Sequence, residues 1–128
     1  MRLLLDTHTL LWWLSDDPSL PVSARKLMAR GTSNLVESAA SAWEIATKVR
    51  LGKLQGVEDL ADDFAGYLVR EQFEPLAVTV EHAVRAGSLP GPHRDPFDRM
   101  LIAQAQAENI PIISNDAAFD SYRVRRLW

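Results

Sequence analysis

The sequence predicts an α/β fold, in which a central parallel sheet of about five strands lies between two layers of helices. Short apolar segments that suit buried strands alternate along the chain with segments of helical periodicity. The apolar segments end in polar residues, and helix-starting residues follow them. No repeat of roughly 20 to 50 residues and no low-complexity segment favours another architecture.

The composition is typical of one compact domain that covers residues 1–128. Of the 128 residues, 47% are hydrophobic and 24% are charged, which is enough apolar surface for a buried core. No segment resembles a linker that would divide the chain. We therefore expect a single three-layer α/β/α domain.

Charge and cysteine content exclude several classes of function. The 14 basic and 17 acidic residues give a net charge of -3, so the chain lacks the positive field of a protein that holds nucleic acid mainly by phosphate neutralisation. An RNA substrate would need bound divalent cations to offset the repulsion. The absence of cysteine excludes disulfides, thiolate nucleophiles and sulfur-ligated zinc.

The start of the chain is not expected to enter a membrane. Asp6 and His8 interrupt the apolar residues 1–5, and no small-residue cleavage site follows. No other segment is long and apolar enough to span a bilayer. We therefore expect a cytoplasmic protein, which also agrees with the lack of cysteine.

The first half of the chain contains two expected strands, each followed by helices. Residues 3–5 form an apolar run that ends at Asp6, which is typical of a buried strand that leads into a loop. Residues 34–37 indicate a weaker second strand. The helices expected after these strands cover residues 9–14, 22–30, 38–51 and 57–72.

One of these helices, over residues 38–51, has a mixed apolar side. We expect Trp43, Ile45 and Val49 to lie on that side, towards the core, and Gly52 to end the helix.

The second half of the chain alternates in the same way. The loop at residues 89–94 is rich in proline and glycine and leads into Asp95-Pro96, a good helix start with proline at the first helical position. The expected elements are strands at 75–79, 110–114 and 124–127 and helices at 81–88 and 96–109, with a turn at Asp116.

Four carboxylates occupy positions that could form one site. In an open parallel sheet, ligands bind beyond the carboxyl ends of the strands. Asp6 and Asp116 each follow an expected strand, and Glu44 lies in the first turns of the helix after the second strand. Asp98 opens the helix before the fourth strand, so it would have to reach the site from the long loop.

Each of these acids also has a purely structural interpretation. Acidic residues in the first turn of a helix interact favourably with its dipole and cap free amides. Residues 41–44 match a capping box, and Asp6 or Asp116 could cap the helices that follow them. Asp95 is best interpreted as the N-cap before Pro96, with Asp98 as a first-turn charge.

Taken together, the acids favour a metal centre. Several carboxylates that face one crevice repel each other, and a hard divalent ion with oxygen ligands, Mg²⁺ or Mn²⁺, relieves this. Such an ion activates water and stabilises charge on a phosphoryl group. His8, His82 and His93 lack metal-ligand spacing, and we expect them at the surface or at helix ends. No nucleophile elbow and no phosphate-binding glycine loop occurs.

Four segments together resemble the PIN-domain ribonucleases of the VapC toxin kind. These segments are residues 4–8 (LLDTH), 41–45 (SAWEI), 93–105 (HRDPFDRMLIAQA) and 113–116 (ISND), and the run DPFDR is the most specific of them. The resemblance covers nearly the whole chain. It implies a PIN-like fold with a five-stranded parallel sheet, a Mg²⁺ or Mn²⁺ site, and cleavage of RNA phosphodiester bonds by metal-bound water.

The resemblance also implies roles for individual residues. Asp6, Glu44, Asp98 and Asp116 match the acidic quartet that holds the metal. The resemblance further suggests contacts with substrate, either to the attacking water or to phosphate. Ser114 matches the small polar residue two positions before the last acid, Thr7 and Asn115 are weaker candidates for its role, and Arg99 either contacts phosphate or pairs with Asp95.

Proteins of this kind are usually toxins of bacterial toxin-antitoxin pairs, form homodimers and are silenced by a small antitoxin protein. Residues 10–14 are apolar on all sides, which fits a deeply buried helix or a face that waits for a partner.

Two other functions compete with a nuclease. Residues 6–9 superficially match the Asp-x-Asp-x-Thr motif of aspartate-based phosphatases, but His8 replaces the second acid and no lysine follows Lys53. A non-catalytic binding module could keep the fold and lose the chemistry, although all four acids are present.

Overall fold

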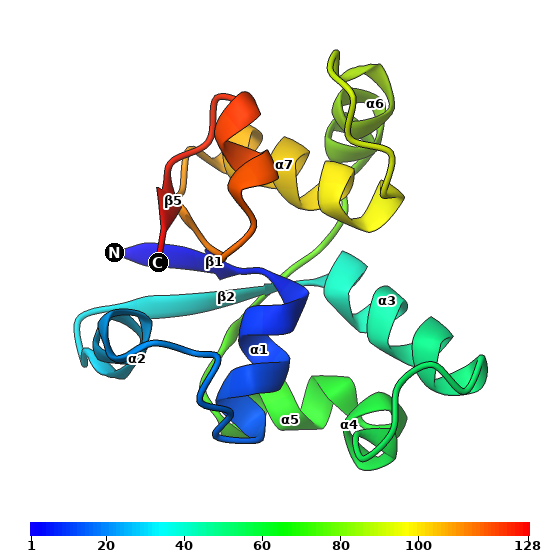
Figure 1. Ribbon diagram of the computed structural model, residues 1–128. Helices are drawn as coiled ribbons and strands as arrows, with labels where there is room; N and C mark the ends of the chain where they lie inside the picture. Colours follow the sequence, from blue (N-terminus) through cyan, green and yellow to red (C-terminus); the bar gives the residue numbers. More distant parts are fainter.

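The computed structural model describes all 128 residues and confirms the α/β class, with helices on both faces of one parallel sheet (Figure 1). The strand order across the five-stranded sheet is β3-β2-β1-β4-β5, and every neighbouring pair is parallel. The strands are β1 (Arg2–Leu5), β2 (Asn34–Ser38), β3 (Glu74–Leu76), β4 (Ile112–Ile113) and β5 (Arg126–Leu127). The helices are α1 (Thr7–Leu14), α2 (Val22–Ala29), α3 (Ala39–Arg50), α4 (Glu58–Asp62), α5 (Phe64–Arg70), α6 (Val80–Ser88), α7 (Pro96–Glu108) and the 3₁₀ helix η1 (Ala117–Ser121).

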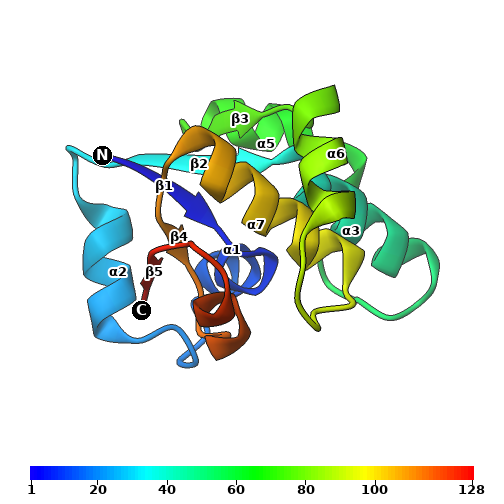
Figure 2. The same ribbon diagram turned by 90° about the horizontal axis from the view of Figure 1, so that it is seen from above.

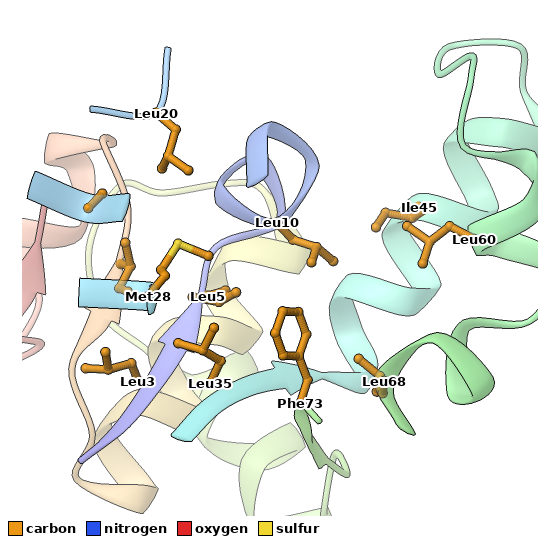
Figure 3. Close-up of a cluster of buried hydrophobic side chains, with 12 residues drawn as sticks. Leu3, Leu5, Leu10, Leu20, Met28, Leu35, Ile45, Leu60, Leu68 and Phe73 are labelled. Carbon is orange, nitrogen blue, oxygen red and sulfur yellow. The ribbon is translucent and has the colours of Figure 1, made fainter. Parts of the chain in front are cut away.

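Alternation along β1 separates two cores. Leu3 and Leu5 belong to one buried cluster, which also includes side chains of α1, α2, α3, α4 and α5 (Figure 3). Leu4 belongs to a second cluster on the opposite face, formed with α7 and η1. Figure 2 shows α7 crossing the sheet with α6 beside it. The sheet is therefore buried on both faces, as parallel sheets usually are.

The prediction of a single helix over residues 57–72 is wrong, because the chain forms two short helices there, α4 and α5. Asp63 breaks the helical path with φ -143° and ψ 61°. Its carboxylate accepts a hydrogen bond from the backbone N–H of Gly66, so it caps α5. An aspartate three residues before a glycine competes for backbone donors and outweighs the apolar periodicity.

The strand expected at residues 75–79 is also too long. Thr79 is the N-cap of α6, and its hydroxyl accepts from the backbone N–H of His82 at 3.1 Å. In return Nδ1 of His82 accepts from the backbone N–H of Thr79, also at 3.1 Å. This capping box ends the extended segment and buries His82, which lies at a helix end, one of the two expected positions.

The start of α3 differs in two ways from the expectation. Ser38 belongs to β2 and caps the helix by accepting from the backbone N–H of Ala40, so residues 41–44 do not form the capping box. Trp43 is 62% exposed and packs edge-on against Phe97, whereas Ile45 is buried. The expectation that Trp43 lies on the core side of α3 is therefore wrong.

The remaining elements agree with the expectations apart from their ends. The strands β4 and β5 are shorter than expected, and α1 begins two residues earlier. Gly52 follows α3 with φ +73°, a conformation that glycine adopts without strain. No helix is both long and apolar enough to cross a lipid bilayer.

Candidate metal centre

The centre of the site forms where β1 and β4 end side by side. Leu5 pairs with Ile113 across the sheet, so the next residues of both strands, Asp6 and Ser114, are neighbours. The Ser114 hydroxyl donates to Oδ2 of Asp6 at 2.7 Å and accepts from the backbone N–H of Asp116 at 3.0 Å. One buried serine thus links two of the predicted acids.

The third acid comes from the first turn of α7. Asp95 caps this helix, as the sequence predicts, by accepting from the backbone N–H groups of Phe97 and Asp98. Its carboxylate is thereby engaged, whereas the side chain of Asp98 reaches the pocket. This pocket of about 480 Å³ is lined by Asp6, His8, Trp12, Asp98, Asn115, Asp116 and Ala117.

The fourth acid, Glu44, lies beside this pocket rather than in its lining. It lines an adjoining pocket of about 510 Å³ together with Thr7 and Lys48. Oε2 of Glu44 accepts an ion-pair contact of 2.5 Å from Nζ of Lys48 one helical turn away. Oε1 is buried and has no hydrogen-bond partner. A carboxylate that is only 3% exposed and half unsatisfied is suited to receive a further cation.

Burial and mutual repulsion disfavour the charged form of two of these acids, Asp6 and Asp98. Burial raises the pKa of Asp6, and the nearby Glu44 adds to the effect, while the hydrogen bond from Ser114 partly opposes it. Burial and the charges of Asp6, Asp95, Glu44 and Asp116 raise the pKa of Asp98 to about 8. A divalent cation would reverse this balance, since it favours the ionised form of every carboxylate around it.

A fifth carboxylate, which was not among the candidates predicted from the sequence, lies beneath the site. Glu37 in β2 is fully buried, and neither of its oxygens has a hydrogen-bond partner. Burial raises the pKa of Glu37 well above its usual value, and the charge of Asp6 adds to this. Burial thus favours the neutral form of Glu37, in which it would supply no charge to the candidate metal centre.

The histidine nearest the acids is His93, which we expected at the surface or at a helix end. Nε2 of His93 lies 3.1 Å from Oδ2 of Asp98. Potential ligand atoms of His93, Asp98 and Asp116 all lie within 4.8 Å of one another. Ligand atoms around one divalent ion are spaced on the order of 3 to 4.5 Å apart, since each lies roughly 2 to 2.3 Å from it. The three groups therefore lie near the spacing that a Mg²⁺- or Mn²⁺-sized ion requires, and small side-chain adjustments would bring them around it.

The candidates for substrate contacts have different surroundings. Asn115 is exposed and lines the acidic pocket, whereas the hydroxyl of Thr7 is buried against that of Ser41 at 2.9 Å. The guanidinium of Arg99 donates to the carbonyls of Ala86, Leu89 and His93. Arg99 forms no ion pair with Asp95. Its guanidinium N–H groups are instead occupied by backbone carbonyls and hold the loop before α7.

Two further site residues, His93 and Lys48, escaped sequence reasoning. Lys48 stands four residues after Glu44, a spacing that indicates an ion pair on one helix face. His93 lies in an irregular loop, where no periodicity relates it to Asp98. Only the path of the folded loop brings its ring to the acids.

The fold and the site define a class of protein, an α/β/α domain with clustered carboxylates beyond the carboxyl ends of a parallel sheet. Residues 3–124 match the family model of the PIN domain, so the chain belongs to this family. The resemblance expected from the sequence is thus confirmed at the level of the family. No curated protein sequence matches the chain significantly.

Several solved structures share the fold at low sequence identity. One is a chain of VapBC2 from Rickettsia felis, whose crystal structure contains a DNA fragment from the VapBC2 promoter. It has a TM-score of 0.73 and 18% sequence identity, and the match covers 99% of this chain and 98% of that chain. A chain of VapBC-1 from nontypeable Haemophilus influenzae has a TM-score of 0.67 and 18% sequence identity, and the match covers 99% of this chain and 97% of that chain. FitAcB from Neisseria gonorrhoeae gives 0.60 and 17%, with 98% and 96% covered.

Proposed function

We propose that this chain is the toxin of a type II toxin-antitoxin system and acts as a metal-dependent endoribonuclease. The observation that carries the proposal is the convergence of Asp6, Asp98 and Asp116 in one pocket beside the half-unsatisfied Glu44. A bound Mg²⁺ or Mn²⁺ supplies an activated water for attack on an RNA phosphodiester and charge stabilisation for the phosphoryl group. Membership of the PIN family supports this chemistry.

Different residues of the chain would bind the cation, orient its ligands and contact the substrate. Asp6, Glu44, Asp98 and Asp116 hold the cation, and Ser114 orients Asp6 through its hydrogen bond. Asn115 lies exposed at the mouth of the pocket, where its amide can bind a phosphate oxygen or the attacking water. We assign Thr7 a supporting role, since its hydroxyl pairs with that of Ser41 between the first turns of α1 and α3.

The partners in this proposal are an RNA substrate, a cognate antitoxin and a second copy of the chain, all in the cytoplasm. Solved structures of similar fold are toxin-antitoxin complexes, among them one from Klebsiella pneumoniae with a TM-score of 0.65. This supports an antitoxin partner. Exposed apolar side chains such as Trp43 support a contact between copies.

The proposal predicts that Asp6→Asn or Asp98→Asn abolishes RNA cleavage. An amide keeps the volume of the carboxylate but loses the charge that a hard cation requires. Cleavage of a defined RNA is measured in Mg²⁺ and in Mn²⁺, with far-UV circular dichroism to verify folding. We expect the cleavage rate to fall on the order of a hundredfold or more, because a carboxylate ligand of the cation and the water that the cation activates are lost together.

The matched control is Asp120→Asn, which changes a surface acid of η1 that pairs with Arg126. This variant should cleave RNA at the parent rate. Cleavage by Asp6→Asn at the parent rate would show that the carboxylates are not the metal site. A parent protein that binds the antitoxin but cleaves no RNA in either metal would favour the non-catalytic binding module.

A further inference from the structure

We propose that His93 is a nitrogen ligand of the divalent cation, together with Asp98 and Asp116, and that it makes the site prefer Mn²⁺ over Mg²⁺. The inference deepens the proposed function, because it concerns the same centre and assigns it a ligand outside the acidic quartet.

The ring nitrogen is close to the acids and unsatisfied. Nε2 of His93 is 3.1 Å from Oδ2 of Asp98, yet it is one of the few buried polar atoms without an aligned hydrogen bond. Distance alone would allow such a bond, so the two groups are close together without pointing their hydrogen-bonding directions at each other. A cation bound by both groups would satisfy the free lone pair of the imidazole and the charge of the carboxylate.

The loop that carries His93 is held at three places. The backbone N–H of His93 donates to the hydroxyl of Tyr122, and its carbonyl accepts from Arg99. The ring packs against Phe119, with 6.3 Å between ring centroids, and the side chain is 16% exposed. These contacts hold the imidazole in place before any ion binds, which lowers the entropy that ligation would otherwise cost.

An imidazole changes which metal the centre selects. Mg²⁺ takes oxygen ligands and water, and it gains little from a nitrogen donor. Imidazole suits the later first-row transition metals, and among the two candidate ions Mn²⁺ accepts a mixed nitrogen and oxygen set more readily. His93 would thus distinguish this centre from one built of carboxylates alone.

A second histidine near the acids, His8, provides a matched control. His8 lines the same acidic pocket as Asp6 and Asp116, but it is exposed and packs on Trp12. No ligand atom of His8 belongs to the cluster within 4.8 Å that includes His93. Exchanging either histidine for glutamine removes one imidazole near the acids, while only the exchange of His93 should affect the metal.

The test is electron spin echo envelope modulation of the Mn²⁺-loaded protein, combined with calorimetric titration of Mn²⁺ and Mg²⁺. We expect modulation from a directly bound ¹⁴N in the parent and in His8→Gln, and its loss in His93→Gln. Mn²⁺ affinity should fall at least about tenfold in His93→Gln, since even changes outside the ligand set cost about 10- to 100-fold. Mg²⁺ affinity should change by less than about threefold.

Each contrary result has a distinct meaning. A parent spectrum without directly bound nitrogen, or equal Mn²⁺ affinity in the parent and in His93→Gln, would overturn the proposal. Thermal unfolding without metal shows whether His93→Gln is folded, and if it is not, the parent spectrum alone decides. RNA cleavage without nitrogen modulation would disprove ligation by His93 and leave the proposed nuclease activity standing. Nitrogen modulation without RNA cleavage would disprove the nuclease activity and leave ligation by His93 standing.

Discussion

Individual residues show what it costs to gather carboxylates before a metal binds. Asp98 lies among four other acids, and its pKa is raised from 3.8 to about 8, with burial as the largest cause. Lys48 compensates in part through its ion pair with Glu44. Burial lowers the pKa of Lys48, but the carboxylates of Glu44, Asp95 and Asp98 outweigh it, so the pKa is raised.

Asp98 predicts how stability of the metal-free protein depends on pH. Its folded pKa exceeds its unfolded pKa, so its contribution is fully present below about pH 4 and is lost as pH rises towards about 8. In chelator, the unfolding temperature should fall between about pH 5 and about pH 8, and Asp98→Asn should reduce that fall. An equally steep fall in Asp98→Asn would contradict the raised pKa. The comparison is made by thermal denaturation at both pH values.

Among the elements, β2 contains the clearest conflict between burial and polarity. Its residues Leu35 and Val36 enter opposite cores, whereas Glu37 places an unpaired carboxyl in the interior. Glu37 pairs in register with Pro75 of β3, and its side chain is fully buried. A buried group without partners is destabilising even when it is neutral.

The conflict predicts that Glu37→Met stabilises the protein. Methionine has a similar length and buries no unsatisfied oxygen, so the free energy of unfolding should rise by about 1 to 3 kcal/mol. Urea denaturation at pH 7 measures the change. The control is Glu74→Met in β3, where the carboxylate pairs with Arg2, and it should give no stabilisation. A less stable Glu37→Met would indicate that Glu37 has partners in solution, such as a bound water.

On the scale of the whole molecule, apolar side chains remain uncovered near the site. The helix α1, for which we expected either deep burial or a face for a partner, is divided, because Leu10 is in the core and residues 11–14 are only partly buried. Leu60 and Leu68 are likewise core residues, while Val69 is 77% exposed. Trp12 lines both the acidic pocket and the adjoining one, so an apolar partner bound there would lie next to the carboxylates.

We expect a homodimer with twofold symmetry. Trp43 is the largest exposed apolar side chain and packs on Phe97, and aromatic side chains dominate the energetics of interfaces. Sedimentation at micromolar concentration should give twice the chain mass of 14.3 kDa for the parent. Trp43→Ala should shift the protein towards monomer, while Val22→Ala on α2 should not. A monomeric parent would contradict the prediction.

Inhibition by an antitoxin should depend on charge as well as on apolar contact. An amphipathic helix laid along residues 11–14 and the exposed edge of α5 could direct an arginine or lysine to the acids. Asp6→Asn should therefore weaken the complex, and excess Mn²⁺ should compete with it. Affinity is measured for the parent and for Asp6→Asn at low and high Mn²⁺. Equal values in all four conditions would leave only apolar docking.

The sequence alone determined the fold class and the three carboxylates of the pocket. Apolar runs followed by helix-starting residues specify parallel strands, and Asp6 and Asp116 follow such strands. Asp98 follows a recognisable helix start at Asp95-Pro96. These are local patterns, and neighbouring residues in the chain are sufficient to read them.

Only the tertiary structure decided which groups meet across the chain. The pairing of Asp6 with Ser114 requires the register of β1 against β4, and 108 residues separate the two side chains. His93 reaches Asp98 because Arg99 and Tyr122 hold its loop. The burial of Glu37 and the exposure of Trp43 depend on which face each neighbouring helix covers. Such contacts have no local signature, since packing of distant elements outweighs the preferences of adjacent residues.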